Sequence, residues 1–121
     1  MITLKSHGFK FSRPEANFVF DVSYFKNPWR KEEIRIEKNS YKRRLQLLEF
    51  MEEQDGVKEL VQGIANIAGA YETLFPHENI IFAICCSAGE YRSPAVVEMV
   101  GAELLKRGIK VDINHSENAK I

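Results

Sequence analysis

The chain has 121 residues, of which 45% are hydrophobic and 28% charged, and its formal net charge is zero. This length and composition predict one soluble domain over residues 1–121, with a core large enough to fold without cross-links. No apolar run reaches the roughly 18 residues of a membrane helix, and the N-terminus lacks a secretion signal. A net charge of zero excludes a global field that would draw the protein to nucleic acid.

The two cysteines, Cys85 and Cys86, are neighbours, and neighbouring cysteines rarely form a disulfide without strain. We therefore expect a reducing, cytoplasmic location. No spacing of Cys or His indicates a metal site, and no cofactor is expected. In a strand the two side chains point to opposite faces, so that Cys86 can face a loop while Cys85 packs into a core.

Two strands are predicted near the N-terminus. Residues 1–5 are predicted as a short edge strand, and Gly8 is expected to mark a turn. Residues 17–22 are predicted as a buried strand. Asp21 lies within this apolar run, where a buried acid requires a partner.

The next segment is charged and is predicted as a mobile surface loop over residues 30–39. Ser40 is the predicted N-cap of a helix that runs from Tyr41 to about Glu53. Its apolar side is predicted from helical spacing to be Tyr41, Leu45, Leu48 and Met51. The basic clusters Arg30-Lys31 and Lys42-Arg43-Arg44 are interpreted as solvated helix faces, with an RNA-binding surface as the alternative.

The second half of the chain predicts helix, strand, helix and strand. An amphipathic helix over residues 57–75 is stopped by Pro76. Residues 79–86 form a continuous apolar run, typical of a parallel strand that is buried on both faces. Ser93 as N-cap and Pro94 as first residue start a helix that ends before Gly108. Residues 109–113 are predicted as a last strand, parallel to 79–86.

These elements predict a three-layer α/β domain with about four mostly parallel strands. Ligands of such sheets bind beyond the carboxyl ends of the strands. Asp21, Cys86 and His115 lie near these ends, so the pattern predicts that they share one crevice.

The turn between strand 79–86 and the following helix carries the main functional prediction. Its small residues let the backbone approach a bound group, and free N–H groups converge there with the positive end of the helix dipole. Arg92 adds a planar fork that matches phosphate oxygens. The predicted phosphate-binding residues are Cys86, Ser87, Ala88, Gly89, Glu90, Tyr91, Arg92 and Ser93, with Glu90 on the outer rim. The alternative is a sharp turn in which Arg92 forms an internal ion pair.

Cys86 and Arg92 are separated by five residues, and residues 86–93 resemble the signature loop of cysteine-dependent protein tyrosine phosphatases. That resemblance implies that Cys86 is the nucleophile, that Arg92 binds the phosphoryl group and that Ser93 steadies the thiolate. A carboxylic acid would protonate the departing alcohol, and Asp21 is the candidate.

A longer resemblance, with gaps, is to the C-terminal domain of the RapZ family of RNase adapter proteins. It rests on the loop Cys86–Ser93, on Ser6, Gly8, Phe9 and Lys10, on Val19-Phe20-Asp21-Val22 and on Asn27-Pro28, whereas His7 departs from the family pattern. Trp29 stands where the family has His or Tyr, and Tyr91 where it has His. The resemblance implies a regulatory module that binds a phosphorylated metabolite, either a sugar phosphate or a nucleotide, and also RNA or a protein partner. Lys10, Asn27, Arg35 and His115 are second-rank contacts for that ligand.

Three hypotheses follow: a phosphate-binding regulatory module, a cysteine phosphatase and an RNA adapter. The first is our interpretation and the second its alternative. The partners expected are a small phosphorylated ligand, phosphate or sulfate, with RNA, a protein or a second copy of the chain as further candidates, and no membrane.

Overall fold

A four-stranded parallel sheet forms the base of the molecule. The computed structural model describes residues 1–121, and its strands are β1 (Ile2–Gly8), β2 (Phe18–Asp21), β3 (Ile80–Cys86) and β4 (Asp112–Asn114). They lie in the order β2-β3-β1-β4, and every pair is parallel. The prediction of a parallel α/β fold is confirmed.

β1 is an interior strand, so the prediction of a short edge strand was wrong. All seven of its residues pair with β3, from Ile2 with Ile80 to Gly8 with Cys86, and β4 pairs on its other side. Gly8 ends the strand and begins the turn that follows, which is closed by a hydrogen bond of 3.2 Å from the Phe11 N–H to the Gly8 carbonyl, so the turn predicted at Gly8 is confirmed. Sheet order depends on contacts distant in sequence, which a short apolar segment does not encode.

β2 is an edge strand and only half of its side chains are shielded, whereas the sequence predicted a buried strand. Asp21 is exposed, and its carboxylate accepts a hydrogen bond of 2.8 Å from the Ser23 N–H. The exposed position removes the need for a buried partner.

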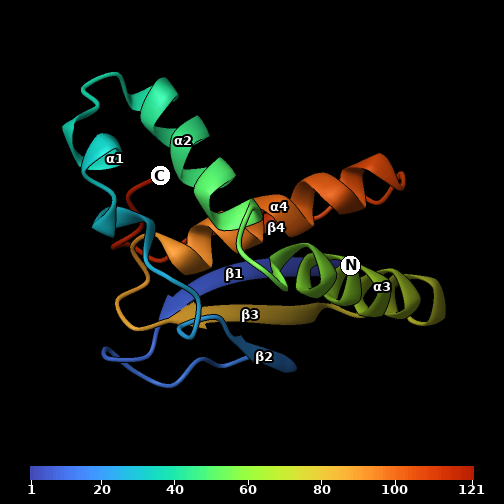
Figure 1. Ribbon diagram of the computed structural model, residues 1–121. Coiled ribbons are helices and arrows are strands. Elements are labelled where there is room, and N and C mark those ends of the chain that lie inside the picture. Colours follow the sequence, from blue (N-terminus) through green and yellow to red (C-terminus); the bar gives the residue numbers. More distant parts are fainter.

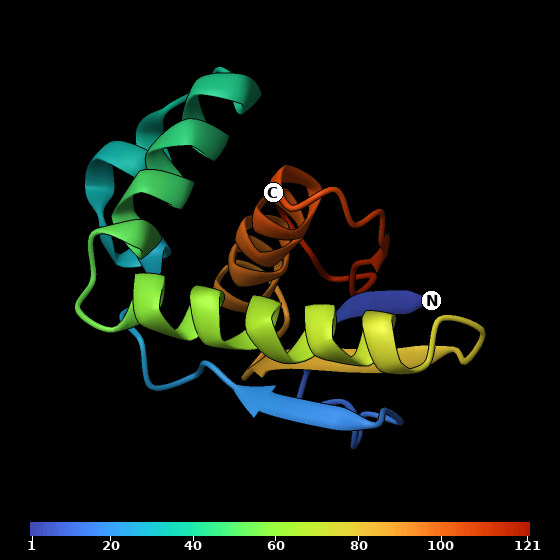
Figure 2. The ribbon, with the colours of Figure 1, turned by 90° about the vertical axis from the view of Figure 1, so that its right-hand side faces the viewer.

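Three layers are visible in Figures 1 and 2: the sheet, then α3 (Val57–Leu74) and α4 (Arg92–Lys106) side by side, then α2 (Ser40–Glu52) above α4. α3 and α4 cover one face of the sheet. The opposite face is crossed by residues 9–17, where the Glu15 carbonyl accepts from Lys5 Nζ at 3.4 Å and the Ser12 carbonyl from His7 Nε2 at 2.8 Å.

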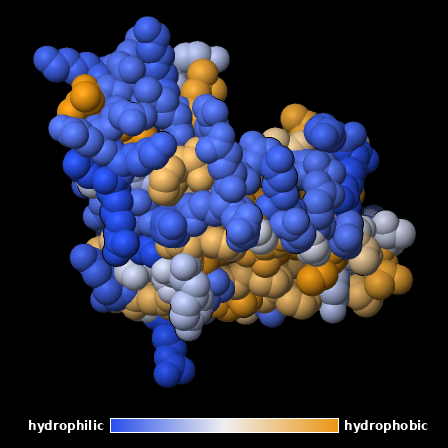
Figure 3. Space-filling view, in the orientation of Figure 1, coloured by the Kyte–Doolittle hydropathy of each residue, from blue (hydrophilic) through white to orange (hydrophobic).

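One core fills the space between the helices and the sheet. It contains Leu4, Phe82 and Ile84 from the strands, Ile64 from α3 and Val96 from α4. The spacing of apolar residues in α3 predicted this face, although Leu74 and Phe75 at its end are exposed. Figure 3 shows hydrophobic residues gathered over the sheet and α3, while the arm formed by α2 is hydrophilic.

The segment predicted as a mobile loop is helical in part. It contains a 3₁₀ turn, η1 (Pro28–Arg30), and a short helix, α1 (Glu32–Ile36). Ile34 is buried, and this anchors α1 beside α2, whereas Ile36 is exposed.

α2 was predicted nearly at its observed bounds, and its buried side was predicted in part. Leu47 and Met51 are its buried residues, while Tyr41 and Leu45 are exposed. The N-cap is Asn39, whose side chain accepts a hydrogen bond of 3.0 Å from the Lys42 N–H. Helical spacing identified Met51 and the partly buried Leu48 correctly, but it missed Leu47 and included the exposed Tyr41 and Leu45.

The ends of α4 and β4 also differ from the prediction. α4 begins at Arg92 with Tyr91 as N-cap, so Ser93 and Pro94 lie inside the first turn. Proline is tolerated there because first-turn N–H groups have no helical partner. β4 starts three residues later than predicted. It is parallel to β3 as predicted, and its hydrogen-bonded neighbour is β1. No helix of the chain has the length and apolar character needed to cross a bilayer.

Candidate functional site

The loop between β3 and α4 is in backbone contact with the end of β1. A Cβ atom at Gly8 would lie 2.5 Å from the Ala88 carbonyl carbon, and one at Gly89 would lie 2.9 Å from the Gly8 nitrogen. Gly89 also has a φ of +72°, in the left-handed region that favours glycine. Both positions therefore require glycine, and together they fix the path of the loop.

The backbone N–H groups of this loop are free. From Ser87 to Ser93, none of the seven N–H groups donates a hydrogen bond to a protein acceptor. The carbonyl groups behave differently: that of Cys86 accepts from Phe9 N, that of Ser87 from Lys10 N and that of Glu90 from Lys120 N. A run of unpaired donors at a helix N-terminus is a setting in which proteins bind anions.

Arg92 is anchored by one nitrogen of its guanidinium. Nη1 donates to the carbonyl oxygens of Ser23 and Phe25, the latter at 3.2 Å. Nε and Nη2 have no protein acceptor, and the side chain is half-buried. The predicted alternative, an internal ion pair, is not present, because the partners of Arg92 are neutral carbonyls.

Cys86 and Ser93 lie against each other beneath the loop. The thiol donates to Ser93 Oγ at 3.2 Å, and both residues are buried. The Ser93 hydroxyl also lies 3.5 Å from the His7 carbonyl. Cys86 is part of the hydrophobic core, so its thiol faces the helices and not the solvent.

Asp21 does not share a crevice with Cys86. Its register partner on β3 is Cys85, and side chains of adjacent residues on a strand point to opposite faces. Asp21 therefore lies on the side of Cys85, away from Cys86. Burial raises the pKa of the Cys85 thiol to about 11, with a further contribution from Asp21, so this thiol stays protonated at neutral pH.

Two further loop residues, Glu90 and Tyr91, are held by contacts with other parts of the chain. Glu90 is half-buried, with its carboxylate 3.4 Å from Lys120 Nζ. Tyr91 is buried and its ring stacks on Trp29, with 4.8 Å between centroids and an angle of 7°. Burial raises the pKa of the Tyr91 hydroxyl, which keeps it neutral as a hydrogen-bonding group.

Three of the four second-rank residues make structural contacts to the loop or to Trp29, which stacks on Tyr91. Lys10 joins the loop through its backbone N–H, while its ammonium group lies 5.3 Å from the centre of the Phe11 ring. The side chain of Asn27 accepts from Trp29 N and caps η1. Arg35 donates to the Trp29 carbonyl at 2.7 Å. All three contacts hold local backbone in place.

His115 belongs to a polar chain beside the loop. Its Nδ1 is 3.1 Å from Ser6 Oγ, and its Nε2 is 3.5 Å from a carboxylate oxygen of Glu98. Glu98 also accepts from Arg44 on α2 at 2.8 Å. Ser6 Oγ accepts from the Ser116 N–H. The chain of contacts therefore joins β1, α4 and α2.

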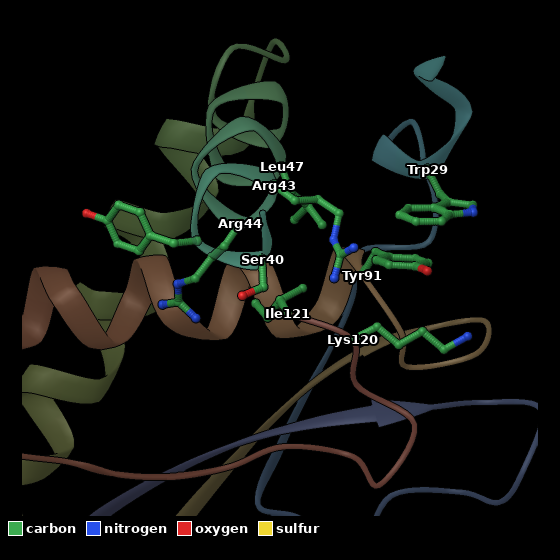
Figure 4. Close-up of a pocket in the computed structure, with 9 residues that line it drawn as sticks. Trp29, Ser40, Arg43, Arg44, Leu47, Tyr91, Lys120 and Ile121 are labelled. Atoms are coloured by element: carbon green, nitrogen blue, oxygen red, sulfur yellow. The ribbon is translucent and has the colours of Figure 1, made fainter. Parts of the chain in front are cut away.

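Sequence reasoning missed a cavity of about 710 Å³ beside the loop. Its walls come from η1, the start of α2, Tyr91 and the C-terminal residues, and they include Trp29, Ser40, Arg43, Arg44, Tyr91 and Lys120. Figure 4 shows Arg43 reaching from α2 toward the stacked rings of Trp29 and Tyr91. The cluster Lys42-Arg43-Arg44 was a signal for it, interpreted as a solvated face.

Comparison with known proteins supports the longer of the two resemblances. The model of the RapZ C-terminal domain matches residues 1–119. A nucleotide-binding protein of Fervidobacterium nodosum is 37% identical over 93% of this chain and 40% of its own length. Proteins of the same description from Laribacter hongkongensis and Glaesserella parasuis are 29% and 30% identical, over 97% and 94% of this chain and 42% and 40% of their own lengths. The chain thus spans about two fifths of these curated relatives, and it belongs to the RapZ C-terminal domain family.

Proposed function

We propose that this domain is a regulatory module that binds a phosphorylated small molecule through the loop 87–93. The observation that carries the proposal is the set of seven backbone N–H groups, from Ser87 to Ser93, without a protein acceptor. Six of these seven residues are buried or half-buried, and Ser87 is exposed. Donors that are shielded from water are unfavourable unless they are hydrogen-bonded. A phosphate group offers several acceptor oxygens and a charge that suits the N-terminus of α4.

Arg92 completes the proposed site in two ways. Nη1 ties the loop after β2 to the start of α4, which holds the guanidinium in one orientation. The free Nε and Nη2 then remain as donors for phosphate oxygens, and charge-assisted bonds of this kind are about twice as strong as neutral ones. We assign Arg92 as the residue that makes this loop specific for phosphate.

Family membership supports the class of ligand. The relatives from Fervidobacterium, Laribacter and Glaesserella are called nucleotide-binding proteins. That description belongs to whole proteins of which this chain spans about two fifths. We extend to this chain only the phosphate-bearing part of such a ligand, either a sugar phosphate or a nucleotide, and a regulatory role in which a partner reads the bound state.

Hydrolysis by Cys86 has weaker support than binding. The thiol is buried in the core, and the candidate acid Asp21 lies on the other side of the sheet. A nucleophile needs access to the phosphorus atom and an acid near the leaving group. We therefore expect no turnover of p-nitrophenyl phosphate. Sustained turnover that is lost on Cys86→Ser would show that the protein is a phosphatase and would overturn the binding proposal.

The direct test is a titration with inorganic phosphate followed by amide nuclear magnetic resonance, with chloride at equal ionic strength as the blank. We expect saturable shifts of the amide signals from Ser87 to Ser93. Shifts confined to other residues, or none, would refute the site.

Two variants check the role of Arg92. Arg92→Ala is expected to weaken phosphate binding at least about tenfold, because charge-assisted hydrogen bonds are lost. Arg92→Lys keeps the charge, but its single nitrogen cannot bond to the Ser23 and Phe25 carbonyls and to phosphate as the guanidinium does. Its affinity for phosphate should therefore lie between those of Arg92→Ala and the unchanged protein. Arg107→Ala is the matched control, since Arg107 lies just after the far end of α4 and pairs with Glu103. Its affinity for phosphate should equal that of the unchanged protein.

A further inference from the structure

The cavity next to the loop is lined by three cationic side chains, Arg43, Arg44 and Lys120, and by no Asp or Glu side chain. Ile121 also lines it, and its terminal carboxylate forms a salt bridge with none of the three. Its volume of about 710 Å³ is in the range of small-molecule sites. Tyr91 lines the cavity and also belongs to the loop with free N–H groups. The cavity and the phosphate loop therefore share a wall.

Arg43 is the cation of this cavity that has no acid partner. Arg44 pairs with Glu98 at 2.8 Å and Lys120 with Glu90 at 3.4 Å. Arg43 is half-buried, and its guanidinium is engaged in neither a salt bridge nor a hydrogen bond. Glu37, the nearest acid before α2, accepts a hydrogen bond from the Asn39 N–H and does not line the cavity. Five guanidinium N–H donors therefore remain available to a ligand.

The position of Arg43 in its helix is unfavourable for the protein alone. The first turn of α2 contains no acid, and Lys42 and Arg43 stand at the positive end of the helix dipole. Cations there oppose the dipole, whereas anions are favoured. The N–H groups of Ser40 and Tyr41 also have no acceptor in the protein. An anion in the cavity would satisfy the dipole, these N–H groups and Arg43 together.

We propose that this cavity is a second anion subsite in which Arg43 is the main contact, so that the preferred ligand carries two anionic groups. This inference rests on the proposed function, because the first group occupies the loop 87–93. The ligand class is a small bis-anionic metabolite, with a phosphate on the loop and a second phosphate or a carboxylate on Arg43. Tyr91 and Trp29 form the wall between the two groups.

Trp29 makes the test direct, because it is the one tryptophan of the chain and lines the cavity. Its fluorescence is titrated with fructose 1,6-bisphosphate and with fructose 6-phosphate at equal ionic strength. We expect the bisphosphate to bind at least about tenfold more tightly, as one additional charge-assisted contact would give. Equal affinities would overturn the inference.

Arg43→Gln should abolish the preference and leave the affinity for the monophosphate unchanged. Lys42→Gln is the matched control, since it removes the same charge from the same turn at an exposed residue that does not line the cavity. If both variants lower the preference equally, the effect is one of general charge and the subsite is refuted.

Two further readouts separate this inference from its alternatives. In the absence of ligand, Arg43→Gln should leave the melting temperature unchanged or raise it, because a cation is removed from a helix N-terminus. A lower melting temperature would indicate that Arg43 is structural and would overturn the assignment. If inorganic phosphate shifts the loop amides but the bisphosphate has no advantage, only the second subsite fails. If the loop amides do not respond at all, the proposed function fails first.

Discussion

The two anion sites that we propose in this domain are neighbours, and they are built from different parts of the chain. The loop 87–93 presents backbone N–H groups, with Arg92 as its cation. The cavity beside it presents side chains, with Arg43, Arg44 and Lys120 in its walls. A backbone site depends on conformation and is damaged chiefly where glycine is required. A side-chain site depends on which residues line it, so that single substitutions can change its ligand preference without changing the fold.

Gly89→Val should have the largest effect, because it breaks the backbone site. A Cβ at Gly89 would lie 2.9 Å from the Gly8 nitrogen and 3.0 Å from Ser116 Oγ, at a φ of +72°. We expect the free energy of unfolding in urea to fall by about 2–4 kcal/mol and the phosphate-induced amide shifts to disappear.

Gly63→Ala is the control for this substitution. Gly63 lies inside α3 with no atom within 4 Å of a new Cβ, so the change should stabilise the protein by about 0.5–1 kcal/mol and preserve binding. Unaltered phosphate binding in Gly89→Val would show that the loop conformation is not what recognises the anion.

Cys85, on the strand β3 below the loop, should make the protein less stable at alkaline pH. The folded protein raises the pKa of Cys85 from 9.0 to about 11. Between these values the folded state keeps a proton that the unfolded state has released. The stabilisation is therefore complete below pH 9.0 and is lost as pH rises through about 11. This contribution to the free energy of unfolding is about 2–3 kcal/mol.

Urea denaturation at a series of pH values measures this loss, with Cys85→Ala as the comparison. Tyr91, whose pKa is also raised by burial, contributes in the same direction at higher pH. The alanine variant should retain only that later part. An alkaline loss as steep in Cys85→Ala as in the unchanged protein would contradict the assignment to Cys85.

Trp29→Ala should damage the cavity and spare the loop. The substitution removes the ring that stacks on Tyr91 at 4.8 Å, and we expect a loss of about 1–2 kcal/mol in unfolding free energy. Binding of inorganic phosphate, measured by the loop amides, should persist. Trp29→Phe keeps an aromatic wall and should behave nearly as the unchanged protein. Loss of phosphate binding in Trp29→Ala alone would mean that the two regions form one site.

The same contrast explains what could be predicted from the sequence. The unit β3–loop–α4 is local: its apolar run, small residues, Arg92 and the helix pattern lie within about thirty residues, so a window of sequence contains the evidence. The contacts that complete it are not local. Arg92 bonds to carbonyls that are 69 and 67 residues away in the chain, and β1 gained its interior place through pairing with a strand 78 positions later, as Ile2 with Ile80 shows.

The cavity was missed for the same reason. It brings together η1, α2, the loop and the C-terminal residues, and no single segment of the sequence contains enough of its residues to predict it. Helical spacing placed the apolar side of α2 on Tyr41 and Leu45, which are exposed, because only the contact with α4 selects the buried side. One local clue existed: basic residues at the start of α2, where acids are usual, indicate a helix end adapted to something other than its own stability.

His115→Gln should have the smallest effect and tests whether the two regions are mechanically joined. His115 links Ser6 on β1 to Glu98, which in turn holds Arg44 at the cavity. Because the Ser6 hydroxyl oxygen already accepts from the Ser116 N–H, we assign its proton to His115 Nδ1, which leaves Nε2–H to donate to Glu98. Glutamine keeps polarity but is too short to span both partners, so we expect a loss of about 0.5–1.5 kcal/mol. His77→Gln, at an exposed position, is the matched control and should change nothing.

If the two regions are coupled, His115→Gln also lowers the preference for the bisphosphate. Without His115, Glu98 is less well oriented, and Arg44 in turn loses the carboxylate that positions it. If the preference stays intact while stability falls, the polar chain holds the fold together and each anion region works on its own.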